Sequence, residues 1–337
     1  MPLRPGHVAA LAAAVLLTLG AVPAGATPSP IRVLVVKATW GPQPYADAAV
    51  DTFMQEVDGF FATASFGKVA MSYTQTPWLD VMPAALPCAN EAQQLPGLAA
   101  SAGWDPAAYD RVVYLVPSGL PSGCIVSSEI SSAAALVNAD SLPIGTVVHE
   151  LGQTFGMGHA GLLSCRYEQQ KRLCYGDQYG DTVDPMGAGG LNNNLAHLGD
   201  FGALQKARAG WLAPTYISKP GIYRLAPLET ASTLPQALVI RGAAGQYWVD
   251  VRAPAGNDAR LGGRSLTGFA VHRIAEAAFP PGTSPLPPDY LVPSARSTSY
   301  YTAPGKTFTL PGRFTLTAVA RTAGVMTIRV RLLGASR

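Results

Sequence analysis

One short segment of the chain gathers residues that together could bind a metal ion and move a proton: His149-Glu150-Leu151-Gly152-Gln153-Thr154-Phe155-Gly156-Met157-Gly158-His159. Residues four apart face the same side of a helix, so His149 and Gln153 could approach one ion while Glu150 lies beside them. Gly156 tolerates a positive φ, which would let the chain turn and bring His159 back toward that ion. Imidazoles bind zinc and a neighbouring carboxylate can act as a general base, so the spacing predicts metal-assisted hydrolysis.

The segment is close to the metzincin pattern HExxHxxGxxH, of which four of the five fixed positions are present. Gln153 occupies the fifth position, and a neutral amide oxygen is a poorer zinc ligand than imidazole. Further along, Tyr175-Gly176-Asp177 is followed by Asp184-Pro185-Met186-Gly187 and by the segment from His197 to Trp211. In this order of motifs, residues 31–212 resemble the gametolysin-like family of secreted metzincin metalloendopeptidases.

The resemblance implies an α+β zincin fold with one catalytic zinc ion. His149 and His159 would ligate the ion, and Glu150 would be the general base. Met186 would be the residue of the Met-turn beneath the metal. Two residues later, where some metzincins place a tyrosine ligand, this chain has Ala188. The implied reaction is hydrolysis of peptide bonds, with Glu150 taking the proton from water and passing it to the leaving amine.

Gln153 leaves three interpretations open. It is a third metal ligand, a hydrogen-bond donor to metal-bound water, or the remnant of a lost site. Other residues that could replace the missing ligand follow it in the chain: His197 and the acidic group Asp177, Asp181 and Asp184. The acidic group could also bind calcium or stabilise a loop, and His197 is typical of an ordinary core or surface histidine.

The elements expected to position this segment form a mixed α/β pattern. The β-branched run from Ile31 to Lys37 predicts a buried strand. Apolar residues near helical spacing predict a long amphipathic helix from Tyr45 to Ala64. Two more strands are expected near Lys68 to Thr74 and Arg111 to Val116, and the metal-binding motif is expected on a helix from Pro143 to Phe155.

The pattern changes after Trp211 to short strand-like runs separated by turn residues. The runs are Ile222 to Leu225, Ala237 to Ile240, Tyr247 to Val251, Phe269 to Arg273, Thr307 to Leu310, Phe314 to Ala320 and Met326 to Leu333. Such a series, without a helical period, predicts a β-sandwich. Because His272 falls within one of these runs, we expect a structural role for it.

Charge changes at the same place. Residues 216–337 contain 14 Lys and Arg against 5 Asp and Glu, a net charge of +9, whereas residues 27–215 contain 9 against 16, a net charge of −7. We therefore predict a metallopeptidase domain over residues 27–215 and a β-sandwich domain over residues 216–337. The basic domain could dock on an anionic surface such as a cell envelope. A solvated basic face, or one that pairs with the acidic first domain, explains the same charge.

The N-terminus has the pattern of a secretory signal peptide. Arg4 and His7 precede an apolar run from Val8 to Leu19, and Ala24-Gly25-Ala26 provides the small residues of a cleavage site. We predict a signal peptide over residues 1–26, cleavage after Ala26 and a secreted, extracellular protein. The apolar run is shorter than the roughly 20 residues of a spanning helix, and no later stretch is apolar enough, so no membrane span is expected.

The four cysteines fit an exported protein. An even number in an oxidising compartment predicts two disulfides. We favour the pairs Cys88 with Cys124 and Cys165 with Cys174, because each closes a modest local loop. The chain has no CxxC pair, which argues against a cysteine metal site.

Composition restricts the classes of function. A hydrophobic content of 48% with only 13% charged residues is typical of a folded protein, and a net charge of +3 is too small to indicate a nucleic-acid partner. The sequence predicts a secreted zinc-dependent endopeptidase whose partner is a polypeptide substrate. Two alternatives come from other classes: a catalytically silent binding protein on a metzincin scaffold, since Gln153 replaces a ligand, and a surface adhesin that binds through its basic domain.

Overall fold

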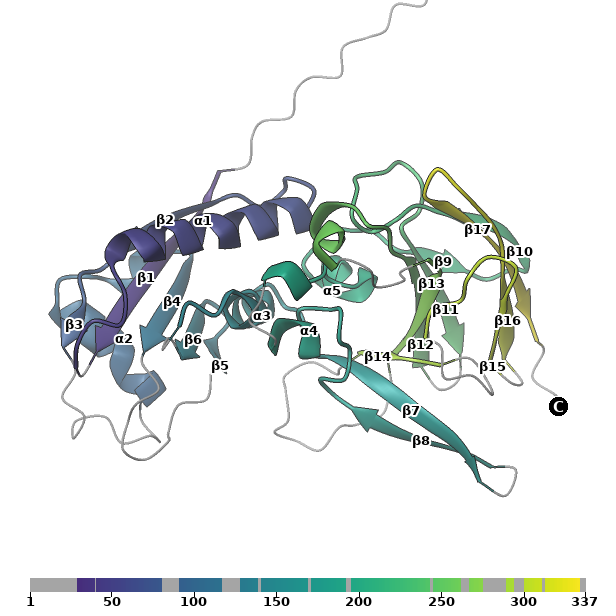
Figure 1. Ribbon diagram of the computed structural model, residues 1–337, viewed down its shortest axis with the longest axis horizontal. Coiled ribbons are helices and arrows are strands. Elements are labelled where there is room, and N and C mark those ends of the chain that lie inside the picture. The colour runs from purple at the N-terminus through teal and green to yellow at the C-terminus, as the bar shows by residue number, and fades with distance from the viewer. Residues whose placement is uncertain are drawn as a thin grey trace, which may run out of the picture.

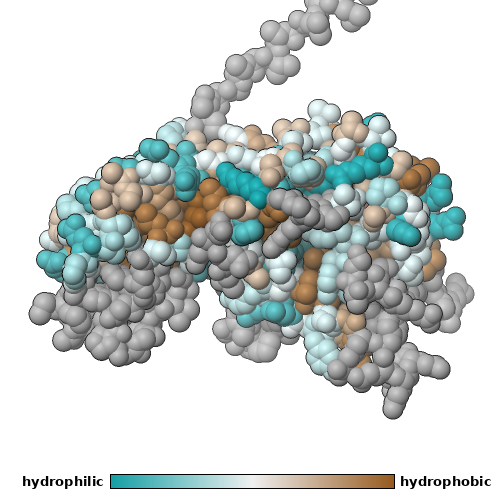
Figure 2. Space-filling view, viewed as in Figure 1, coloured by the Kyte–Doolittle hydropathy of each residue, from teal (hydrophilic) through white to brown (hydrophobic). Residues whose placement is uncertain are grey.

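The computed structural model describes residues 29–39, 41–80, 91–116, 128–138, 141–168, 171–191, 195–242, 245–261, 267–274, 289–293, 300–310 and 313–333. The predicted signal peptide lies outside these residues, as do Cys88 and Cys124. Within them, no helix is both long enough and apolar enough to cross a membrane. The first half of the chain is α+β and the second half is rich in strands, as the sequence predicts (Figure 1). On the same side of the molecule, hydrophilic and hydrophobic residues lie beside one another at the surface (Figure 2).

The predicted strand at the start of the described chain is an interior strand of a six-stranded sheet. It pairs in parallel with one neighbour on each side, and alternate side chains enter cores on opposite faces: Val33 and Val35 on one, Leu34 and Val36 on the other. Burial on both faces explains its continuous apolar run. In sheet order the strands are β2 (Met71–Gln75), β1 (Ile31–Thr39), β4 (Arg111–Val116), β6 (Ala134–Asn138) and β5 (Ser128–Ser131), with β3 (Leu79–Asp80) beside the end of β1.

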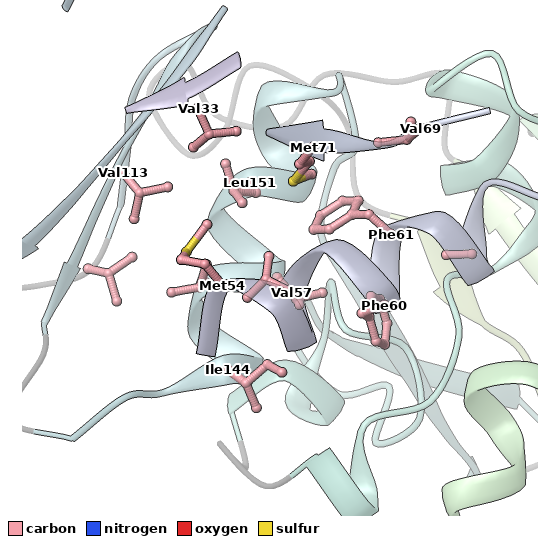
Figure 3. Close-up of a cluster of buried hydrophobic side chains, with 14 of the residues drawn as sticks. Val33, Met54, Val57, Phe60, Phe61, Val69, Met71, Val113, Ile144 and Leu151 are labelled. Atoms are coloured by element: carbon pink, nitrogen blue, oxygen red, sulfur yellow. The ribbon is translucent and has the colours of Figure 1, made fainter. Parts of the chain in front are cut away.

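Both predicted helices of the first half are present, as α1 (Asp47–Ala64) and α3 (Ile144–Thr154). They share one apolar core on the same face of the sheet. Figure 3 shows Phe61 of α1 and Leu151 of α3 within this core, beside Val33 and Val113 of the sheet. A further helix, α2 (Glu91–Ser101), contributes Leu95 and Ala99 to the core on the opposite face. The metal-binding motif therefore begins on a helix that is fixed by core packing.

A long hairpin that the sequence analysis did not predict follows His159. It consists of β7 (Ala160–Glu168) and β8 (Lys171–Asp177), which pair antiparallel and project from the body of the molecule (Figure 1). Cys165 lies directly opposite Cys174 and the two form a disulfide, so the second predicted pairing is confirmed.

Two sheets in the second half enclose one apolar core, to which Val249 and Phe269 contribute from one sheet and Phe308 and Ile328 from the other. The four-stranded sheet has the order β10 (Gly221–Leu225), β17 (Val325–Leu332), β16 (Phe314–Thr322) and β15 (Thr307–Leu310). The seven-stranded sheet has the order β8, β7, β14 (Asp289–Leu291), β13 (Phe269–Ile274), β12 (Gly245–Val251), β11 (Ala237–Gly242) and β9 (Thr215–Ile217).

The seven-stranded sheet draws strands from both halves of the chain. β14 pairs in parallel with β7, with Asp289 opposite Ala160, so the strand that follows His159 is hydrogen-bonded to the β-rich half. The short helices α4 (Ala188–Leu191) and α5 (Ala203–Arg208) connect the two halves. Three turns of 3₁₀ helix complete the described elements: Pro106–Ala108, Leu195–His197 and Gly256–Leu261.

Candidate functional site

The candidate site lies at the C-terminal end of α3. His149 and Glu150 are buried there, and Gln153 is half-buried one turn later. The helix ends at Thr154, and Gly156 has a φ of +81°, in the left-handed region that favours glycine. The predicted turn is therefore present, and the chain continues from it to His159.

Three side-chain atoms converge at this point. Gln153 Nε2 lies 3.2 Å from His149 Nε2 and 3.1 Å from His159 Nε2. The centroids of the two imidazole rings are 5.5 Å apart. The structure thus brings together the residues that the sequence proposed as ligands, with the same nitrogen of each imidazole toward the amide group.

His149 is oriented by the backbone of a distant loop. Its Nδ1 donates to the carbonyl oxygen of Pro185 at 2.8 Å, which leaves the lone pair on Nε2. Burial lowers the pKa of His149 to about 4, with a smaller lowering by the neighbouring His159, although the hydrogen bond to Pro185 opposes the shift. Burial also lowers the pKa of His159, although Gln178 opposes this shift. Both imidazoles are therefore neutral at neutral pH, which is the form that ligates metals.

Met186 packs against α3 at Gly152. Its side chain is completely buried, and a Cβ atom added at Gly152 would lie 2.7 Å from Met186 Sδ. Gly152 therefore gives the sulfur room inside a helix where glycine is otherwise unfavourable. The carboxylate of Asp184 fixes the loop that carries Met186, because it accepts the N–H groups of Met186 and Gly202 at 2.8 and 2.7 Å.

Tyr179 is a site residue that the sequence analysis missed. Its ring centroid lies 4.2 Å from that of His159 and 6.0 Å from that of His149. Burial raises the pKa of Tyr179, and the charge of Glu150 raises it further. The N–H of Ala188 donates to the carbonyl oxygen of Tyr179 at 2.6 Å. The sequence analysis considered a tyrosine only at position 188, whereas the fold supplies one from the end of the β7–β8 hairpin.

The other suggested ligands do not join the two histidines. His197 is exposed, whereas Asp181 and Asp184 are buried and accept backbone N–H groups. Asp177 accepts the N–H of Tyr179 at 3.0 Å, which agrees with a loop-stabilising role. Among the described residues, no three His, Cys, Asp or Glu side chains lie close enough to hold a metal ion.

A buried cluster of charged residues, here called the junction, connects the loop of Met186 to the β-rich half. Two of its ion pairs are Lys206 with Asp200 at 2.8 Å and Arg252 with Asp258 at 3.1 Å. The same cluster contains His272, whose ring nitrogens lie 3.4 and 3.5 Å from carboxylate oxygens of two aspartates. The aspartates are Asp250 and Asp289. The structural role expected for His272 agrees with this position.

The junction also reaches the loop that carries His159. Gln205 accepts the N–H of Gly158 at 3.0 Å and donates to Asp289 at 3.4 Å. The N–H of Asp289 in turn donates to the carbonyl oxygen of His159 at 3.1 Å. The β-rich half therefore helps to position one of the two histidines.

No protein-family model matches this chain, and a search of curated proteins finds no match.

Proposed function

We propose that this chain is a secreted zinc-dependent endopeptidase of the gametolysin-like metzincin type, which hydrolyses peptide bonds of extracellular proteins. The observation that carries the proposal is the meeting of three side chains at the end of α3, where Gln153 Nε2 lies 3.2 and 3.1 Å from the Nε2 atoms of His149 and His159. Glu150 follows His149 on the same helix and is buried. The site thus combines neutral ligands with a carboxylate that can accept a proton.

The donor types are ones that zinc accepts, because imidazole nitrogen is a common zinc ligand and an amide oxygen a poorer one. Ligand atoms about 2.1 Å from a tetrahedral zinc ion lie roughly 3.4 Å apart. The distances from Gln153 Nε2 to the two imidazole nitrogens, 3.2 and 3.1 Å, are close to this value. A half-turn about the last side-chain bond of Gln153 exchanges its amide nitrogen and oxygen, after which the oxygen faces the histidines. His149, His159 and Gln153 would then hold the ion.

Each neighbouring residue has a task in hydrolysis. A zinc ion supplies Lewis acidity, which makes water a better nucleophile and polarises the scissile carbonyl group. Glu150 accepts a proton from the attacking water and delivers it to the leaving amine. Pro185 keeps His149 in the tautomer whose Nε2 carries a lone pair. Tyr179 packs against the ring of His159 and limits its rotation.

The proposal extends to the rest of the chain. It includes a signal peptide over residues 1–26, a metallopeptidase domain over residues 27–215 and a β-sandwich domain over residues 216–337. The disulfide between Cys165 and Cys174 supports an oxidising compartment outside the cytoplasm.

Metal analysis tests the proposal. The full chain, purified without added zinc or chelator, is expected to contain about one zinc ion and to cleave a denatured protein until chelator is added. The Gln153→His variant should bind zinc more tightly, and Gln153→Leu should bind it more weakly, because only the first supplies an imidazole. Zinc in the Gln153→His variant alone would overturn the proposal.

A second function is favoured by one feature of the same geometry. The two hydrogens of the Gln153 amide nitrogen can donate to the Nε2 lone pairs of His149 and His159, so the amide satisfies both imidazoles without an ion. In this alternative the protein keeps a protease scaffold and acts only by binding. A native chain without zinc and without chelator-sensitive hydrolysis is the result expected for such a binding protein.

A further inference from the structure

We propose that the outer face of the four-stranded sheet binds an anionic polysaccharide. This inference goes beyond the proposed peptidase activity, because it concerns a different surface and does not depend on the metal. The surface, here called the arginine face, is made of outward residues from all four strands. Its members are Arg224, Arg329, Arg331, Thr307, Thr309, Thr315, Thr317 and Thr327.

The direction of these side chains follows from the alternation of burial along each strand. In β17, Met326, Ile328 and Val330 enter the core, whereas Arg329 and Arg331 are exposed. β10 shows the same alternation, since Leu225 is buried and Arg224 is exposed. Successive side chains of a strand point to opposite faces, so the three arginines share the outer face.

Strand register aligns the arginines with threonine hydroxyls. Arg331 lies opposite Thr315, which lies opposite Thr309. In the adjacent row, Arg329 lies opposite Thr317, which lies opposite Thr307. Each row thus runs from a cation to two hydroxyl groups across neighbouring strands, which gives donors for both the charged and the uncharged oxygens of a sugar chain.

The arginines are spaced along a line. Residues two apart on a strand lie about 6.8 Å apart, which is the expected separation of Arg329 and Arg331. Arg224 lies opposite Thr327 and therefore diagonal to Arg329, at about 7–8 Å. A guanidinium fork binds carboxylate or sulfate through two parallel hydrogen bonds. A series of such forks suits a linear polymer with repeated negative groups.

Charge complementarity supports an anionic occupant. Within the described part of residues 216–337, every acidic side chain is buried: Glu229, Asp250, Asp258 and Asp289. The described surface of this half therefore presents basic residues without exposed carboxylates. None of Arg224, Arg329 and Arg331 forms an ion pair with another described residue. These arginines are therefore available to an anionic partner.

A polysaccharide suits this face better than a lipid surface. Insertion into a membrane interface uses large apolar or aromatic side chains beside basic ones. The large apolar residues exposed on or next to this face are Val319, Leu333 and Ile222, the last of which lies opposite Arg329, and none of them is aromatic. The flat, hydroxyl-rich face offers hydrogen bonds rather than insertion.

The test measures binding of the full chain to labelled dextran sulfate and polygalacturonate by fluorescence anisotropy at several salt concentrations. The native chain is expected to bind both polymers but not uncharged dextran. The triple variant Arg224→Gln, Arg329→Gln and Arg331→Gln should lose affinity by about tenfold or more. The slope of log affinity against log salt concentration should also become shallower by about 2, which is roughly 0.7 for each of the three lost contacts.

A matched triple variant separates this face from general positive charge. Lys219→Gln, Arg241→Gln and Arg260→Gln remove the same charge from exposed positions outside the arginine face and should leave binding nearly unchanged. Three results would each overturn the proposal. They are equal losses of affinity in both triple variants, no binding of the native chain to either polymer, and binding of the native chain only to phosphatidylglycerol vesicles. Zinc content and hydrolysis should be the same in both variants, so failure here is distinct from failure of the peptidase proposal.

Discussion

His149 of α3 and His272 of β13 are both buried, but the first has uncharged neighbours and the second has negatively charged ones. His149 is 3% exposed and has a carbonyl oxygen, an amide group and a second imidazole as neighbours, so burial lowers its pKa to about 4. His272 is also 3% exposed, and burial acts on it in the same direction. The charges of Asp250 and Asp289 outweigh that effect, so the pKa of His272 is raised.

The difference shows how one residue type acquires two roles. An imidazole without an adjacent carboxylate stays neutral and keeps a lone pair for a metal or a hydrogen-bond donor. An imidazole between two carboxylates takes a proton and becomes a cation, which here connects three adjacent strands. The first environment is suited to chemistry and the second to structure. Variants that change one region should therefore leave the other largely unchanged.

The largest effect is expected for Glu150→Gln. This substitution keeps the shape of the side chain and removes the proton acceptor, so hydrolysis of a denatured protein should fall by about 10²–10⁴-fold. Because the junction is untouched, the urea midpoint should stay close to that of the native protein. Rates and unfolding curves for the two proteins check both expectations. Undiminished hydrolysis would remove Glu150 from the mechanism.

Arg252→Met in the junction should have the opposite pattern of effects, because it changes stability rather than the chemistry of the candidate site. Arg252 is almost completely buried and pairs with Asp258, so its removal leaves a buried carboxylate without its cation. Breaking such a pair costs about 3–5 kcal/mol of unfolding free energy. Arg260→Met, at an exposed position of the same half, is the matched control and should change stability little. Urea unfolding monitored by tryptophan fluorescence measures both, and equal midpoints would contradict the assigned role of the pair.

Two glycine-to-alanine substitutions compare the stability effect of a new methyl group at the packed site with its effect on an open helix surface. Gly152→Ala places a Cβ 2.7 Å from Met186 Sδ, and overpacking of this kind costs about 1–3 kcal/mol. Gly59→Ala in α1 meets no atom within 4 Å and should add about 0.5–1 kcal/mol through helix propensity. Thermal unfolding of both variants should therefore move in opposite directions. A stabilised Gly152→Ala protein would show that Met186 can move away at little cost.

Sequence spacing was sufficient to predict the core of the candidate site. The separations from His149 to Gln153 and from Gln153 to His159 are local, and helix geometry with one turn at Gly156 determines where these residues lie. Tyr179 could not be found in this way. Its contact with His159 depends on the β7–β8 hairpin and on the backbone bond from Ala188, both of which form through distant pairing.

There is also a physical reason why the sequence analysis did not predict the β7–β8 hairpin. Gly161 and Gly176 weaken the strand pattern in sequence, yet both lie beneath the ring of Tyr290, where an added Cβ would approach the ring to 2.7 and 2.8 Å. That ring belongs to β14, a strand of three residues that is too short to give a period. The junction was hidden for a similar reason, because isolated aspartates spread from position 181 to position 289 resemble solvated surface residues until the fold buries them.

The smallest effect is expected in the pH dependence of stability above pH 6.5. The raised pKa of His272 gives a contribution that is fully present below about pH 6.5 and is lost as pH rises through the folded value. Asp250, Asp289 and Asp181 raise this pKa, while burial and Arg252 oppose them. The pKa of His149 is lowered to about 4, so its contribution is lost only when pH falls below about 6.5. Loss of the proton from His272 in the junction therefore changes stability above about pH 6.5. Protonation of His149 in the candidate site changes stability only below about pH 6.5.

His272→Gln should make the fall in the urea midpoint of the metal-free protein between about pH 6.5 and pH 9 less steep, because one of the groups that lose a proton in this window is gone. Asp184, whose pKa is raised to about 8 by burial and by the charge of Asp181, remains and keeps part of the fall. His197→Gln removes an exposed imidazole and should keep the native slope. Parallel slopes for all three proteins would mean that His272 is neutral in the fold despite its two aspartates. The buried imidazoles of His149 and His272 would then both be neutral, and the contrast of charge between the two regions would be lost.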